Sequence, residues 1–249
     1  MSAEIENKEK VFTHENLDMY LGELAKEYRR LSGRKTPAEI ILVGGAAIIS
    51  QYSFRNSTTD IDAVIQASSA MKEAITRVEE RYNLPYGWIN TDFQKTTSYS
   101  CNIVRYSSYY RSFYQILSVR VLKGEYLLAM KLRAYRGYKH DISDIVGVLW
   151  AHKDLGKPIT MEKVEKAVIE LYGTWDGISP IALQFIKEAL ECEDYKELYN
   201  KTEKDEQEAK AILVEFEKQY PNALSGENIR NIIESLRRKK QVDQDTESE

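Results

Sequence analysis

The chain has 249 residues, of which 43% are hydrophobic and 30% are charged, and this is the composition of an ordinary globular protein. Its net charge of -4 excludes the overall positive field that many nucleic-acid-binding proteins carry. No apolar run approaches the about 20 residues that span a membrane, and the polar N-terminus is unlike a signal peptide. We therefore expect a cytoplasmic protein that makes no use of a membrane.

The first half of the chain alternates helical patterns with short strand patterns. Apolar residues recur at helical spacing up to Leu31, and a serine, a glycine and a proline then end that helix. The predicted elements that follow are a buried strand over 39–43, a short helix over 46–52, a strand over 60–65, a helix up to residue 82 and a strand over 113–122. This order predicts a small core with a mixed sheet and flanking helices.

Helical spacing dominates the second half of the chain. Helices are predicted over 125–135, 142–151, 161–172, 180–192, 202–220 and 227–240. We therefore expect an α+β fold in which residues 1–155 form the core with its N-terminal helix and residues 156–240 form an all-helical region. The polar, acidic residues 241–249 are predicted to be a disordered tail.

The pair Asp60 and Asp62 is the most informative feature of the sequence. Two aspartates at positions i and i+2 of a strand project their carboxylates to the same side, where they repel each other unless a cation lies between them. Upstream, Gly44 and Gly45 follow an apolar strand, and glycines let backbone amides approach a phosphate closely. A phosphate turn followed by oxygen ligands suited to Mg²⁺ favours chemistry on a nucleoside triphosphate (NTP).

Hydroxyl and charged residues extend this pattern. Ser57, Thr58 and Thr59 precede the aspartates and offer hydroxyls to the metal or to the phosphates. Downstream, Lys131 lies on a predicted helix, where its charge can neutralise a triphosphate or a leaving pyrophosphate.

Asp141 and Asp144 open the next predicted helix and share one of its faces. Asp141 has an alternative explanation as a plain helix cap, because aspartate favours that position.

Two segments carry a family resemblance. Residues 41–65, with the diglycine turn before Asp-Ile-Asp, resemble the signature of the nucleotidyltransferase superfamily, which has a polymerase-beta-like fold. The block from Leu127 to Ile145, with Ala-Met-Lys-Leu and then Asp-Ile-Ser-Asp-Ile, resembles a narrower branch. That branch contains AbiEii-type toxin nucleotidyltransferases, their MenT-like relatives and domains of the DUF6036 kind. The resemblance covers residues 38–150 and leaves the C-terminal helices unmatched.

The resemblance implies a function and a set of roles. It implies a magnesium-dependent enzyme that moves a nucleotide from an NTP to an acceptor hydroxyl, such as one on tRNA or a protein. Asp60 and Asp62 would bind the metal and act in catalysis together with Lys131 and Asp141. Substrate-binding residues would be Gly44, Gly45, Ser57, Thr58, Thr59 and Asp144. A toxin- or defence-associated role with a separate antitoxin partner would follow.

One departure from the superfamily pattern keeps an alternative open. Polymerase-like members carry a third carboxylate on a later strand, but no Asp or Glu occurs between Tyr110 and Leu122, and Asp92 is the nearest acid upstream. In the narrower branch Lys131 and Asp141 complete the site instead. The alternative is a catalytically degenerate module that binds nucleotide, RNA or a protein partner without turnover.

Overall fold

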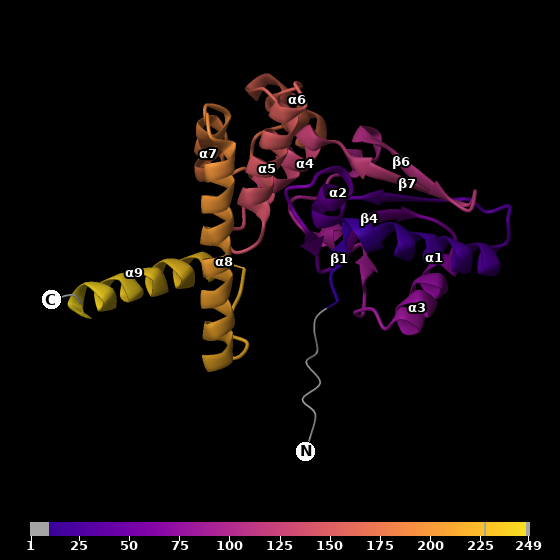
Figure 1. The fold of residues 1–249 in the computed structure, drawn as a ribbon, viewed down its shortest axis with the longest axis horizontal. Coiled ribbons are helices and arrows are strands. Elements are labelled where there is room, and N and C mark those ends of the chain that lie inside the picture. Colours follow the sequence, from indigo (N-terminus) through magenta and orange to yellow (C-terminus); the bar gives the residue numbers. More distant parts are fainter. Residues whose placement is uncertain (1–9, 227, 248–249) are drawn as a thin grey trace, which may run out of the picture.

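The computed structural model describes residues 10–226 and 228–247. It has the predicted α+β architecture, in which a mixed five-stranded sheet with helices is followed by an all-helical C-terminal region (Figure 1). The strands are β1 (Phe12–Thr13), β2 (Ala38–Leu42), β3 (Ser57–Thr58), β4 (Ile61–Gln66), β5 (Ile89–Asn90), β6 (Ser107–Phe113) and β7 (Leu117–Leu122). The α-helices are α1 (His14–Ser32), α2 (Gly44–Gln51), α3 (Ala70–Tyr82), α4 (Gly124–Ala134), α5 (Asp141–Asp154), α6 (Met161–Tyr172), α7 (Pro180–Leu190), α8 (Tyr195–Gln219) and α9 (Ile229–Glu247).

The sheet has the strand order β5-β4-β2-β7-β6, with β2 at its centre. Strand β2 runs antiparallel to β4 and parallel to β7, so that Leu42 lies between Ala63 and Val121. Helices α1 and α3 pack together along one side of the sheet (Figure 1). Strands β1 and β3 form a separate antiparallel pair. The centre of the sheet therefore leads directly into α2 and places the loop before β4 beside it.

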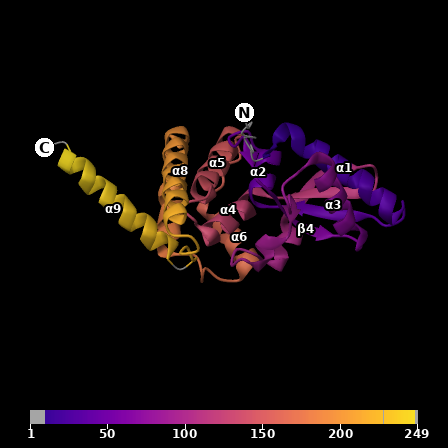
Figure 2. The ribbon, with the colours of Figure 1, turned by 90° about the horizontal axis from the view of Figure 1, so that it is seen from below.

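One large cluster of buried apolar side chains extends from Phe12 in β1 to Tyr199 in α8. A second, smaller cluster joins α8 to α9 through Ala209, Leu213 and Ile233. Helix α9 then runs away from the rest of the chain (Figures 1 and 2). The large cluster contains residues on both sides of position 155, where we predicted the boundary between the core and the helical region. The domain boundaries therefore stay a prediction.

Besides the short strands β1, β3 and β5, which the sequence did not predict, the structure differs from the predicted elements at three places. The single strand expected over 113–122 is a hairpin of β6 and β7, which turns at Tyr114 and Gln115. Helix α8 begins at Tyr195, seven residues before the predicted start, where Asp194 caps it through the Glu197 amide. Helix α9 runs to Glu247 and so covers most of the predicted tail, of which residues 248–249 lie outside the described residues.

No helix in the described part of the chain is long and apolar enough to cross a membrane.

The loop between α2 and β3 is packed tightly against α5. The Phe54 ring lies over Gly147 in α5, and it also stacks on Tyr52 and meets the edge of Tyr199, with ring centroids 5.6 Å apart in both cases. A Cβ atom at position 147 would lie 2.4 Å from two ring carbons of Phe54. Gly147 is therefore required for this contact between the α/β core and the helical half.

We predict that Gly147→Ala destabilises the protein, because the added methyl group would force the Phe54 ring away from α5 and out of its contacts with Tyr52 and Tyr199. The expected loss in the free energy of unfolding is about 1–3 kcal/mol, measured by urea denaturation. Gly226→Ala is the control, since nothing lies within 4 Å of the Cβ position there. Equal stability of the two variants would contradict this packing.

Candidate active site

A cleft of about 880 Å³ opens between the loop before β4, the start of α2, helices α4 and α5, and one side of α8. Nine of the ten predicted site residues line it: Gly44, Gly45, Ser57, Thr58, Thr59, Asp60, Asp62, Lys131 and Asp141. The tenth, Asp144, is buried behind Lys131. Residues that are far apart in the sequence therefore meet in one cavity, whose volume is within the ordinary range for a small-molecule site.

The diglycine turn forms the amino end of α2. Gly44 has a φ of +54°, a left-handed conformation that favours glycine, and a Cβ atom there would lie 3.3 Å from Oδ2 of Asp62. A Cβ atom at Gly45 would lie 2.5 Å from Oγ1 of Thr58 and 3.0 Å from Nη2 of Arg55. Both glycines are therefore needed for the close approach of this turn to Asp62 and Thr58. The Asp62 carboxylate lies beside the amino end of α2, where the helix dipole favours negative charge.

Asp62 is the second residue of β4, and Asp60 lies in the bend just before that strand. Burial and then the negative charge of Asp60 raise the pKa of Asp62 to about 6, against the opposing charges of Lys131, Lys139 and Arg136. The two carboxylates are therefore close enough to repel each other, and three cationic side chains are near enough to affect them.

Asp60 and Asp62 fit a magnesium ion in the number of carboxylate ligands that they supply. Mg²⁺ is commonly held by one or two carboxylates together with substrate phosphates, and Asp60 and Asp62 supply that number. A dedicated protein cage is a different arrangement: among residues 10–226 and 228–247, no group of three or more His, Cys, Asp or Glu side chains could hold a metal ion. The donor set therefore suits a metal that arrives with, or is completed by, the phosphates of a nucleotide.

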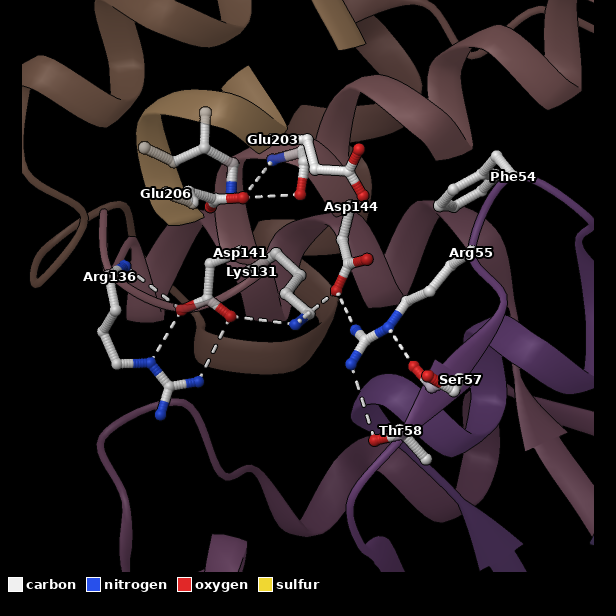
Figure 3. Close-up of polar contacts among 12 residues, drawn as sticks. Phe54, Arg55, Ser57, Thr58, Lys131, Arg136, Asp141, Asp144, Glu203 and Glu206 are labelled. Atoms are coloured by element: carbon white, nitrogen blue, oxygen red, sulfur yellow. Dashed lines mark hydrogen bonds and ion pairs between the residues drawn. The ribbon is translucent and has the colours of Figure 1, made fainter. Parts of the chain in front are cut away.

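Lys131 of α4 lies between two buried carboxylates of α5 (Figure 3). Its Nζ atom is 2.8 Å from Oδ1 of Asp141 and 2.8 Å from Oδ2 of Asp144. Burial lowers the pKa of Lys131, but the charges of the two aspartates outweigh burial, so that the pKa is raised overall. The lysine is therefore fixed as a cation at the wall of the cleft.

Asp141 also binds Arg136, which Figure 3 shows on the other side of its carboxylate. Oδ2 accepts hydrogen bonds from Nε of Arg136 at 2.7 Å and from its backbone amide at 3.1 Å. Burial opposes ionisation of Asp141, but the charges of Lys131 and Arg136 hold its pKa below the usual value. Asp141 is thus a buried, doubly paired carboxylate, and the side chain does not point outward as a plain helix cap.

Arg55 connects this cluster to the α/β core. Its Nη1 atom donates to Oδ2 of Asp144 at 2.8 Å, while Nε donates to the Ser57 carbonyl at 2.9 Å (Figure 3). Nη2 lies 3.5 Å from Oγ1 of Thr58. The segment before Asp60 is therefore held against α5 by one guanidinium.

Glu206 of α8 reaches the same region from the C-terminal helices. Its carboxylate accepts hydrogen bonds from the amides of Ile142 and Ser143 and from the Ser143 hydroxyl. Burial raises the pKa of Glu206 to about 8, against the opposing effect of these bonds. The carboxyl group of Glu206 lies at the amino end of α5, where it contacts the two residues that follow Asp141.

Comparison with known proteins adds a family. Residues 19–179, more than half of the chain, match the sequence model of a family described as a nucleotidyltransferase of unknown function (DUF6036). The chain belongs to this family. The predicted superfamily and enzyme class are thereby confirmed, and the family implies a nucleotide substrate, while the AbiEii and toxin resemblance is not shown. Neither curated proteins nor solved structures yield a match.

Nucleotidyltransferases generally use divalent metals, which agrees with the donor set of Asp60 and Asp62. The sequence patterns assigned no role to several charged side chains of the cleft, among them Arg55, Arg136, Lys139 and Glu206. Arg136 and Lys139 lie within five residues of Asp141, so a cluster of basic residues before that aspartate was a usable signal. Arg55 and Glu206 meet their partners only in the folded chain, and no local pattern indicates them.

We predict that, in the absence of divalent cations, Asp62→Asn raises stability at pH 8. Because the folded-state pKa of Asp62, about 6, is above the ordinary value of 3.8, the folded protein holds this proton more tightly. The fold therefore loses stability as pH rises from 3.8 to about 6, and the loss is complete above that range. The expected gain is about 1–3 kcal/mol at pH 8, and it disappears near pH 4. Urea denaturation at both pH values measures it, with the exposed Asp205→Asn as the control. A gain that is independent of pH would contradict this environment.

We also predict that Arg55 and Asp144 are energetically coupled. Arg55→Met and Asp144→Asn each remove one partner of a buried ion pair, so the double variant loses less stability than the sum of the single losses. The expected coupling is about 0.5–3 kcal/mol from a double-mutant cycle in urea. The exposed pair Lys204 and Glu208, with Nζ and Oε1 3.9 Å apart, is the comparison, and its coupling is expected below about 0.5 kcal/mol. Additive losses at Arg55 and Asp144 would refute the bridge.

Proposed function

We propose that this protein transfers a nucleotide from an NTP to an acceptor hydroxyl with the help of Mg²⁺. The acceptor oxygen forms a bond to the α-phosphorus, the bond from that phosphorus to the leaving oxygen breaks, and pyrophosphate and the hydroxyl proton are released. The observation that carries the proposal is that the diglycine turn, the aspartate pair and the Lys131–Asp141 pair line one cleft.

Each element of the cleft has a part in this reaction. Asp60 and Asp62 would hold the metal, which when bound would neutralise phosphate charge. Gly44 and Gly45 let the amides of α2 approach the phosphates, and Ser57, Thr58 and Thr59 add hydroxyl donors.

Lys131 is the cation that stabilises charge on the transferring group or on pyrophosphate, and Asp141 holds it in place. Asp144 does not line the cleft, and its carboxylate meets Arg55 and Lys131, which supports a positioning role in place of direct substrate contact.

The resemblance to AbiEii- and MenT-type enzymes supports a narrower form of the proposal. In it the acceptor is a tRNA or a protein, and the enzyme acts as a toxin or in defence beside a separate antitoxin protein. A degenerate binding module is the second candidate. The observation that favours it is that, in the described chain, only two carboxylates without an ion-pair partner, Asp60 and Asp62, line the cleft near the diglycine turn. Polymerase-like members carry a third carboxylate.

The test is label transfer from each of the four α-labelled NTPs, with Mg²⁺, to tRNA or to the protein itself. We predict transfer by the wild type and a loss of more than about 100-fold in Asp62→Ala and in Asp60→Ala, because the phosphate charge would lose its metal. Asp92→Ala is the matched control, since Asp92 lines the same cleft but is exposed and paired with Lys95 at 2.7 Å.

The outcomes separate the two candidates. Equal labelling by wild type and Asp62→Ala with every NTP would refute the proposed transferase. Magnesium-dependent nucleotide binding by the wild type without transfer to either acceptor would favour the binding module. Chelation of divalent cations should abolish transfer by the wild type, and this arm checks the metal requirement separately from the variants.

A further inference from the structure

Helix α8 lies outside the residues that match the family, yet it forms part of the cleft wall. Glu206, Gln207, Lys210 and Leu213 face the cavity from this helix. Figure 1 shows that α8 runs beside α5, and the two helices are in extensive contact. The C-terminal helices are therefore placed where they can affect the chemistry of the cleft.

Glu206 is the side chain through which α8 reaches the site. The residue is 3% exposed, and its Oε1 atom accepts a hydrogen bond from the Ile142 amide at 2.6 Å. Its Oε2 atom accepts from the Ser143 amide at 3.3 Å and from the Ser143 hydroxyl at 2.5 Å (Figure 3). A carboxylate from one helix thus binds the first turn of another helix more than 60 residues away in the sequence.

The first turn of α5 depends on this external carboxyl group. The amides at the start of a helix lack partners within the helix, and a capping side chain normally accepts from them. His140 occupies the cap position of α5 but makes no such bond in the described structure. Glu206 therefore supplies the cap that the chain around His140 does not.

The capped turn carries Asp141, the first residue of α5. Asp141 is fully buried and holds both Lys131 and Arg136. Movement of this turn would shift the Asp141 carboxylate and with it the charged end of Lys131. The capping bonds of Glu206 are thus connected to the cationic group of the cleft through one residue.

We propose that Glu206 is a positioning residue of the transferase, which orients the Asp141–Lys131 pair by capping α5. The C-terminal helical region is then a part of the catalytic unit and is not only an attached surface. This inference rests on the proposed function. Glu206 acts on Asp141 through the backbone of Ile142 and Ser143, and it makes no contact with the reacting atoms in this role.

The experiment compares Glu206→Ala, Glu206→Gln and the control Glu208→Ala, an exposed glutamate of the same helix. Label-transfer kinetics give kcat and the KM for the NTP, and hydrogen exchange reports on the amides of Ile142 and Ser143. In Glu206→Ala we expect kcat to fall about 10–100-fold with KM for the NTP nearly unchanged, and faster exchange of both amides. Glu208→Ala should match the wild type in all three measurements.

Glu206→Gln separates positioning from mere docking of α8. Its amide oxygen still accepts from Ile142, but its NH₂ group meets the Ser143 amide, so kcat should fall less than in the alanine variant and KM should again be unchanged. If Glu206→Ala does not fold, the glutamine variant carries the test alone. A folded Glu206→Ala with wild-type kcat overturns the role of Glu206, even where that variant is less stable. Where the alanine variant does not fold, wild-type kcat in Glu206→Gln overturns it.

Failure of the proposed function gives a different result. A wild-type protein that transfers no label under any condition refutes the transferase and, with it, this role. An active wild type together with either of these overturning results refutes the positioning role alone.

Discussion

A buried row of alternating charges holds the candidate active site together: Arg55, Asp144, Lys131, Asp141 and Arg136. Each carboxylate in the row lies between two cations. Removing one member would leave a neighbouring buried charge with one partner fewer, which costs more than breaking an exposed pair. The five side chains therefore fix one another, and the row joins the loop between α2 and β3 to helices α4 and α5.

Stability alone does not account for such a row, because apolar replacements of buried ion pairs are often neutral or stabilising. The row does more than join elements, since it orients long, flexible side chains that would otherwise sample many rotamers. Arg55 is held beside Gly45 and Thr58, and Lys131 is held at the cleft wall. The row contains three cations and two anions, so it adds one positive charge to a cleft that receives a polyanion in the proposed reaction.

Local sequence patterns predicted the parts of this protein that local physics determines. The diglycine turn and Asp60-x-Asp62 were readable because backbone freedom and carboxylate spacing act within a few residues. The hairpin of β6 and β7 was missed because Tyr114 and Gln115 adopt φ values of 50° and 56° without the Asn or Gly that such a turn usually shows. Arg55 and Glu206 could not be assigned, since the carboxylate partner of Arg55 is 89 positions away and the groups that Glu206 binds are 63 or more positions away.

The pairing pattern also explains why a cation is expected at one carboxylate pair and not at the other. Asp141 and Asp144 are neutralised within the protein by Lys131, Arg136 and Arg55. In the described part of the chain neither Asp60 nor Asp62 has an ion-pair partner, and their mutual repulsion helps to raise the pKa of Asp62. A divalent ion bound at Asp141 would have to displace two cations that are already in place. At Asp60 and Asp62 it would relieve repulsion, so the electrostatics of the cleft favour the end beside the diglycine turn for the proposed metal.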